Sequence, residues 1–142
     1  MRDKPFVTEI SVKNSPKEIW NAITVKDQMI QWFFENIPDF KAEVGFYTEF
    51  PVSPGERSFT HQWTILDVVP LEKITYNWEY EEYTGNARVS FEIIDKGEHR
   101  IIRLTNFGLH TFPEDIPEFT YESCKGGWEY FINSRLKSFL EE

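Results

Sequence analysis

Cysteine is almost absent from this sequence, because Cys124 is the only one among 142 residues. A lone cysteine excludes a disulfide within the chain and is typical of proteins in a reducing compartment. Basic residues are also scarce: 15 Lys and Arg stand against 24 Asp and Glu, which gives a formal net charge of −9. A surface of this charge repels nucleic acid phosphates and anionic lipids, so we expect no nucleic acid partner and no membrane insertion.

Long apolar runs are missing as well. No run approaches the ~18–20 residues that span a membrane, and the opening stretch MRDKPFVTEI lacks the apolar region of a signal peptide. Together with the lone cysteine, this pattern predicts a cytoplasmic protein. The length is that of an ordinary domain, so we expect one domain over residues 1–142.

Motifs that carry catalysis or hold cofactors are absent too. The sequence has no glycine-rich phosphate loop, no GxSxG and no HExxH. His61, His99 and His110 are scattered and have no second ligand at metal-binding spacing. Cys124 lies on an apolar stripe without a basic neighbour to activate it, which indicates a buried, inert thiol. The sequence therefore predicts no metal, no cofactor and no catalytic residue.

The middle of the chain is rich in aromatic residues, and apolar and polar side chains alternate along it. This alternation is typical of antiparallel strands with one buried face. Between the first two strands, Ser15, Pro16 and Glu18 signal the start of one short helix, and Asp27 is placed to cap a second. We expect strands at 6–13, 44–50, 59–65, 74–80, 87–93 and 100–107, with turns at 70–73, 84–86 and 96–97.

The last segment predicts a long helix, because its apolar residues recur at every third or fourth position. Asp115 is placed to cap it, and a helix from about Pro117 to Leu140 is roughly 36 Å long, enough to cross a sheet. Gly126 and Gly127 then lie inside the helix. Gly127 flanks the buried stripe whereas Gly126 points away, so we expect Gly127 to mark a close approach to the sheet or the mouth of a cavity.

Seven short stretches, taken in order, resemble one protein family. They are SPKEIWNAIT at 15–24, IQWF at 30–33, VGF at 44–46, ILDVVPLEKITYNW at 65–78, ARVSFEI at 87–93, TNFGL at 105–109 and GGW at 126–128. The chain is similar to small bacterial proteins related to the C-terminal domain of the activator of Hsp90 ATPase, within the START/Bet v 1-like (SRPBCC) superfamily. The resemblance implies an α+β helix-grip fold, with a six-stranded curved antiparallel sheet wrapped around a long C-terminal helix and two short helices between strands one and two.

In this superfamily a cavity between sheet and helix holds apolar ligands such as lipids, sterols or polyketides. Members of the family often have histidine where this chain has Asn106, so the resemblance carries over no titrating group at that position. Polar residues with predicted inward positions are Thr48, His61, Tyr76 and Asn106. The aromatic residues expected around a cavity or at its rim are Trp32, Phe33, Phe46, Phe50, Trp63, Trp78, Phe91, Phe112, Trp128 and Phe131. The alternative is that these rings fill the core completely.

Three functions are compatible with these observations. The first is non-enzymatic binding of a small apolar or aromatic molecule, such as a lipid, a polyketide or a flavonoid-like compound. The second, which the resemblance implies, is a co-chaperone-like module that contacts an Hsp90 homologue. The third is a cyclase- or hydrolase-type enzyme that uses His61 or Tyr76 as acid or base, although neither residue has a visible partner to orient it.

Overall fold

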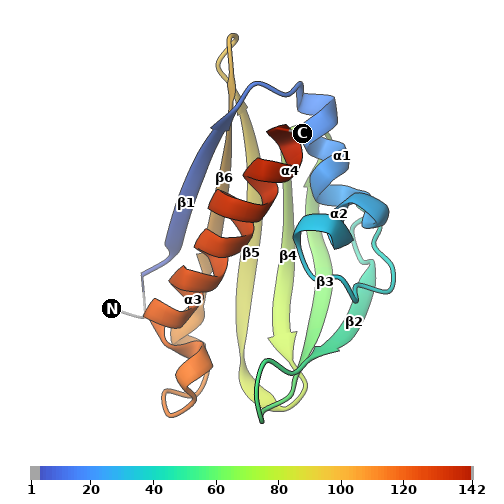
Figure 1. Cartoon of the computed structure of the whole chain (residues 1–142). Coiled ribbons are helices and arrows are strands. Elements are labelled where there is room, and N and C mark those ends of the chain that lie inside the picture. The colour runs from blue at the N-terminus through green and yellow to red at the C-terminus, as the bar shows by residue number, and fades with distance from the viewer. Residues whose placement is uncertain (1–3, 142) are drawn as a thin grey trace.

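The computed structural model describes residues 4–141 and has one antiparallel sheet of six strands (Figure 1). The strand order is β1-β6-β5-β4-β3-β2, so β1 and β2 form the two edges. Inward side chains alternate with outward ones along most of the sheet, as the sequence predicts, with a break in β3 where the register shifts between Ile65 and Asp67. The strands are β1 (Phe6–Val12), β2 (Tyr47–Val52), β3 (Phe59–Val69), β4 (Lys73–Tyr80), β5 (Tyr83–Asp95) and β6 (Arg100–Phe107).

Several predicted strand limits are wrong, most clearly those of β2, the end of β3 and both ends of β5. β2 begins at Tyr47 rather than at residue 44, because Gly45 has a φ of 93° and leaves the extended conformation. β2 also continues through Pro51, which is tolerated because β2 is an edge strand and needs no further donor there. The turn between β4 and β5 lies at 81–82 and not at 84–86, since Tyr80 pairs with Tyr83.

The short helices α1 (Pro16–Thr24) and α2 (Lys26–Trp32) follow β1. Ser15 forms the predicted capping box: its hydroxyl accepts from the N–H of Glu18 at 3.2 Å, and the Glu18 carboxylate accepts from the N–H of Ser15 at 2.9 Å. The predicted cap of α2 by Asp27 is wrong. Val25 both ends α1 and precedes α2, which places Asp27 in the first turn of α2.

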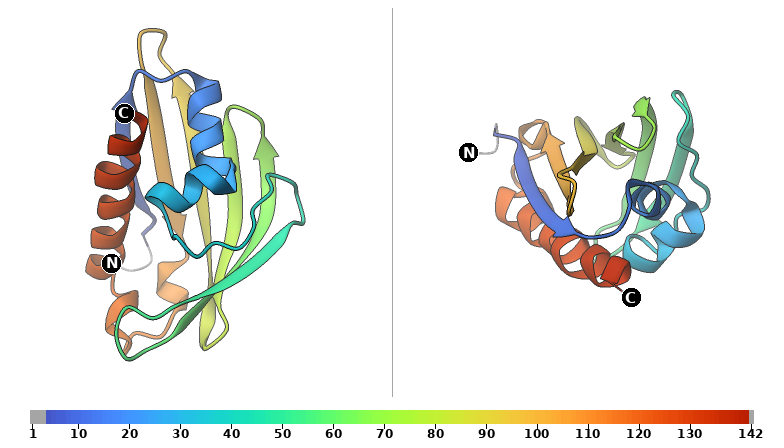
Figure 2. Two further views of the ribbon diagram at one scale, coloured as in Figure 1. Left: turned by 45° about the vertical axis from the view of Figure 1, so that its right-hand side comes forward. Right: turned by 90° about the horizontal axis from the view of Figure 1, so that it is seen from above.

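The C-terminal helix runs continuously through α3 (Tyr121–Trp128), a π-helical segment at Glu129–Leu136 and α4 (Lys137–Glu141). The predicted start at Pro117 is wrong, because Pro117–Phe119 forms a separate 3₁₀ turn, η2. Thr120 caps α3 instead, with its hydroxyl accepting from the N–H of Ser123 at 3.2 Å. The long helix and the α1–α2 pair both cover the open side of the curved sheet (Figure 2). The helix-grip architecture is confirmed.

Aromatic rings fill most of the space between the sheet and the helices. Trp32, Trp63 and Tyr76 are fully buried, and the Trp63 and Tyr76 ring centroids lie 5.0 Å apart. Phe33 packs against Trp32 at 4.7 Å and against Trp63 at 5.5 Å. Close packing of this kind leaves little free volume in the middle of the layer. Open space is instead found at the end of the sheet where α3 begins.

Candidate ligand pocket

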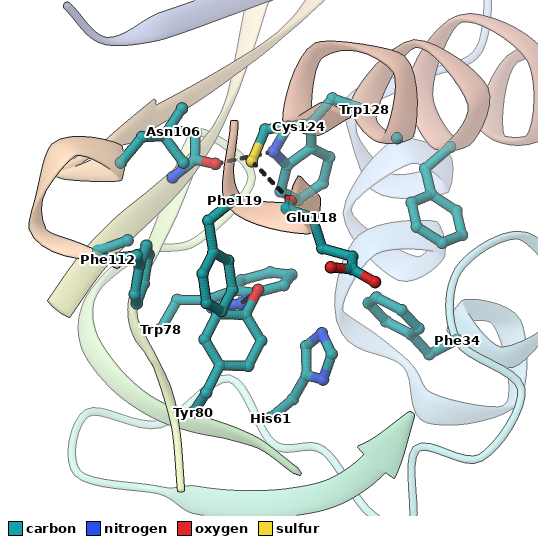
Figure 3. Close-up of a pocket in the computed structure, with 14 residues that line it drawn as sticks. Phe34, His61, Trp78, Tyr80, Asn106, Phe112, Glu118, Phe119, Cys124 and Trp128 are labelled. Carbon is teal, nitrogen blue, oxygen red and sulfur yellow. Dashed lines mark hydrogen bonds between the residues drawn. The ribbon is translucent and has the colours of Figure 1, made fainter. Parts of the chain in front are cut away.

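A pocket of about 140 Å³ lies at that end, between the inner face of the sheet and the start of the C-terminal helix (Figure 3). Two short 3₁₀ turns, η1 (Leu109–Thr111) and η2, also contribute to its wall. A cavity of about 150 Å³ with apolar walls is large enough to bind benzene. The pocket is lined by Phe34, His61, Trp78, Tyr80, Ala87, Asn106, Leu109, Phe112, Glu118, Phe119, Cys124, Gly127, Trp128 and Phe131.

The structure brings together about half of the residues that the sequence predicts for a cavity. The predicted residues that line this pocket are His61, Trp78, Asn106, Phe112, Gly127, Trp128 and Phe131. The predicted residues that do not line it are Trp32, Phe33, Phe46, Thr48, Phe50, Trp63, Tyr76 and Phe91. The second group lies outside this pocket, because most of these side chains are buried and pack against one another.

Tyr76 illustrates the difference. Its side chain is fully buried beside Trp63 and lies outside the pocket lining. Burial raises the pKa of its hydroxyl well above the ordinary value, so the phenol stays protonated. Tyr76 therefore lies outside this pocket, with its hydroxyl in the protonated form.

Several lining residues are missing from the prediction. Tyr80 could have been found, because it continues the inward alternation of Tyr76 and Trp78 along β4. Phe34 lies just after α2, where helical periodicity no longer tells which way a side chain points. Phe119 belongs to η2, a turn that the sequence pattern joins to the long helix. Ala87, Leu109, Glu118 and Cys124 complete the set that the cavity prediction missed.

His61 is the titratable group with the most defined geometry in the pocket. Its Nδ1 lies 3.0 Å from the carbonyl oxygen of Phe59. A carbonyl oxygen can only accept, so Nδ1 carries the hydrogen and donates, which leaves Nε2 with a free lone pair in the neutral ring. Burial lowers the pKa of His61 to about 4, while the bond to Phe59 and the charge of Glu82 act in the opposite direction. His61 is therefore neutral near pH 7.

Four aromatic rings hold the imidazole of His61 in place. Phe50 stacks on it with centroids 5.2 Å apart, and Phe34 lies at 4.8 Å. Trp78 and Tyr80 meet the ring edge to face at 5.4 and 4.9 Å. The imidazole extends from β3 into the space between Tyr80 and Phe34 (Figure 3). Its orientation is set by packing and by its backbone hydrogen bond together.

Other polar groups of the pocket are paired with one another. The Nε1–H of Trp128 donates to Oδ1 of Asn106 at 2.9 Å, which links the C-terminal helix to β6. The Nε1–H of Trp78 donates to the hydroxyl of Tyr80 at 2.8 Å. Burial raises the pKa of Tyr80, so this hydroxyl keeps its proton at neutral pH. Both indoles are therefore fixed with their N–H groups satisfied.

Glu118, Cys124 and Gly127 form the helical side of the pocket. Arg57, from the loop between β2 and β3, reaches across to Glu118, and its Nη1 lies 3.2 Å from Oε1. Because 44% of the Arg57 side chain and 31% of the Glu118 side chain are exposed, this ion pair is weak. Cys124 donates from Sγ to the carbonyl oxygen of Glu118 at 3.8 Å. A carboxylate thus borders the pocket on this side.

Gly127 does not mark a close approach to the sheet. A Cβ atom added at Gly127, or at Gly126, meets no heavy atom of the described residues within 4 Å. That part of the prediction is wrong. Gly127 does line the pocket, whereas Gly126 does not. The two glycines are interior to the helix as predicted, and they differ in that only Gly127 borders the pocket.

Residues 4–141 contain no group of three or more His, Cys, Asp or Glu side chains placed to hold a metal ion. Within the same range, no helix has the length and apolar character needed to cross a bilayer.

Comparison with known proteins agrees with this architecture. The family model described as "Activator of Hsp90 ATPase homolog 1-like protein" matches residues 13–141. The chain belongs to this family. No curated protein matches the sequence.

Solved structures similar to this member of the family show the same fold. Protein MLL2253 from Mesorhizobium loti is 22% identical, with 97% of both chains covered and a TM-score of 0.77. The Aha1 dimer from Colwellia psychrerythraea is 19% identical over 97% of this chain and 96% of that one, with a TM-score of 0.74. DynU16, from the dynemicin biosynthetic locus, is 20% identical over 98% of this chain and 48% of that one, with a TM-score of 0.76. Identities this low establish the fold alone.

Proposed function

We propose that this protein is a non-enzymatic binding domain for a small apolar or aromatic molecule. The observation that carries the proposal is the pocket of about 140 Å³, whose wall consists mainly of aromatic rings with a few oriented polar groups. Ligand sites in proteins typically have this composition. Membership of a helix-grip family adds support, because the pocket lies between the sheet and the C-terminal helix.

The pocket volume limits how large the ligand can be. Sites for drug-sized molecules enclose about 300–1,000 Å³, whereas this pocket matches the volume that accommodates one benzene ring. Lipids, sterols and flavonoids are larger than the pocket. We therefore propose a single-ring compound, or an aliphatic molecule of similar size, as the occupant.

A titration tests this function. Toluene, phenol, naphthalene and a flavonoid are each added to the protein, and binding is monitored by the backbone and aromatic chemical shifts. Shifts at His61, Trp78 and Trp128 should saturate with the single-ring compounds and stay small with the flavonoid. Ala87→Leu adds three carbon atoms at a buried position of the wall and should abolish the response. If none of the compounds binds, the proposal is refuted.

The two helix glycines offer a matched pair of variants for the same test. Gly127→Leu places a side chain beside the pocket, and Gly126→Leu makes the same change one residue away, outside the pocket lining. We expect Gly127→Leu to weaken binding of the single-ring compounds and Gly126→Leu to leave it unchanged. Equal effects would show that binding occurs elsewhere.

A second candidate function is a co-chaperone-like module that acts on an Hsp90 homologue. It is supported by the description of the family, which names an activator of Hsp90 ATPase. This function requires a location in the cytoplasm, which the lone cysteine also favours. Addition of the protein to the purified bacterial chaperone should then change its ATPase rate, and Ala87→Leu should leave that effect intact because it fills only the pocket. An unchanged rate would remove this candidate.

A further inference from the structure

Among the aromatic rings of the pocket, His61 presents a nitrogen lone pair that can accept a hydrogen bond. Nδ1 of His61 is tied back to the carbonyl oxygen of Phe59, two residues earlier on the same strand. Nε2, on the distal edge of the ring, is then the nitrogen on the side of the pocket (Figure 3). In the neutral imidazole this nitrogen is an acceptor only. A ligand that reaches it must supply the hydrogen.

The two neighbouring indoles do not compete for this role. The indole N–H groups of Trp78 and Trp128 are already donated to Tyr80 and Asn106. Glu118 places a carboxylate in the wall, where the partly exposed Arg57 pairs with it, and the whole chain carries a net charge of −9. An anionic ligand such as a carboxylate has no hydrogen to donate to Nε2. It would also lie near the carboxylate of Glu118. The electrostatics of the pocket therefore oppose carboxylates and favour neutral molecules.

We propose that the pocket selects uncharged single-ring compounds that carry a hydroxyl or N–H group, with phenol as the simplest example, and that this group donates its hydrogen to Nε2 of His61. The selection rests on the proposed function, since it specifies which small ring the pocket takes. Four flanking rings fix the imidazole before the ligand arrives, so little ordering is required on binding. A site with a fixed acceptor discriminates against analogues that lack the donor, because the acceptor is then buried without a partner.

Phenol and toluene are a matched pair of probes, because each has seven heavy atoms and they differ only in a hydroxyl or methyl group. Their dissociation constants are measured for the wild type and for His61→Phe. For each protein we take the ratio of its affinity for phenol to its affinity for toluene. Comparing this ratio between the wild type and His61→Phe cancels the different hydration of the two probes. We expect the preference for phenol to fall by about tenfold in His61→Phe, the size of one hydrogen bond. Phe131→Leu, which alters the wall without replacing any of the four rings around His61 and removes no polar atom, should change both affinities together and leave the ratio unchanged.

A measurement on the wild type avoids dependence on the folding of any variant. The nitrogen chemical shifts of His61 should show the hydrogen on Nδ1, and the Nε2 signal should move when phenol is added but not when toluene is added. Benzoate should bind far more weakly than phenol. If toluene binds and the ratio is the same in wild type and His61→Phe, or if benzoate binds as tightly as phenol, the inference is overturned while the proposed function stands. If neither toluene nor phenol binds, the proposed function itself fails.

Discussion

Acidification should destabilise this protein through one buried side chain, His61. In the folded state burial lowers the pKa of His61 to about 4, against 6.5 for an exposed imidazole. Only 5% of the residue is exposed, so the charged form has little access to water. The hydrogen bond to Phe59 and the charge of Glu82 favour protonation but do not offset the burial. The unfolded chain has no such restriction and takes up the proton readily.

The sign and the size of the effect follow from this difference in pKa. Between about pH 6.5 and pH 4 the unfolded chain binds more protons at this site than the folded protein does, so the free energy of unfolding falls as the pH falls. A lowering from 6.5 to about 4 corresponds to roughly 3 kcal/mol at the acidic end of the window. Above about pH 6.5 the contribution is fully present, and below about pH 4 no more is lost at this site.

Urea unfolding, followed by tryptophan fluorescence across this pH window, measures the effect in the wild type and in His61→Phe. Glu82 and Glu118 are retained in both proteins, so the difference between the two curves isolates the imidazole. The wild type should lose about 3 kcal/mol more than the variant between about pH 7 and pH 4. If both proteins lose the same amount, His61 is hydrated or charged in the folded state, and the conclusion that burial lowers its pKa is refuted.

Four further substitutions test the C-terminal helix and its attachment, each by denaturant unfolding. Gly126→Ala and Gly127→Ala should each raise the free energy of unfolding by ~0.8–1 kcal/mol, because the added Cβ meets no described atom; a loss at either position would show a contact that the structure lacks. Thr120→Ala should lower it by about 1 kcal/mol through loss of the cap on α3, and no change would indicate that the helix begins elsewhere. Asn106→Ala should lower it by ~1–3 kcal/mol by leaving the buried N–H of Trp128 without an acceptor, and a neutral result would mean that water replaces the amide.

The fold could be predicted from the sequence because its signals are local and repeated. Alternation along β4 fixes which side chains face inward, and the capping box at Ser15 fixes the start of α1. The errors lie where two local signals compete. Pro117 suits the first turn of a helix, but Thr120 provides a side-chain cap closer to the apolar stripe, so α3 starts later than predicted. The position of the turn between β4 and β5 depends on the pairing of Tyr80 with Tyr83, and the alternation of side chains alone does not specify this pairing.

The pocket could be predicted only in part, because an inward direction does not distinguish a packed side chain from one that borders space. Trp63 and Trp78 are cross-strand partners and both face inward, yet only Trp78 lines the pocket. The difference depends on what the helices place above each ring. Phe33 covers Trp63 at 5.5 Å and leaves no room there, and its position follows from the end of α2 rather than from any pattern in β3.

Small residues determine where the space remains. Ala87 pairs with Trp78 in the sheet and is buried, so β5 contributes only a methyl group to the wall at this level. Further along β5, Val89 and Phe91 contribute larger side chains to the packed core.

On the helical side Gly127 contributes no side chain at all. Since an added Cβ at Gly127 meets nothing, the glycine does not bring the helix closer to the sheet. Its effect is to leave volume unfilled beside the pocket, and Ala87 does the same from the sheet. Volume at these two positions, more than the number of aromatic rings, therefore sets the size of the pocket in this member of the family.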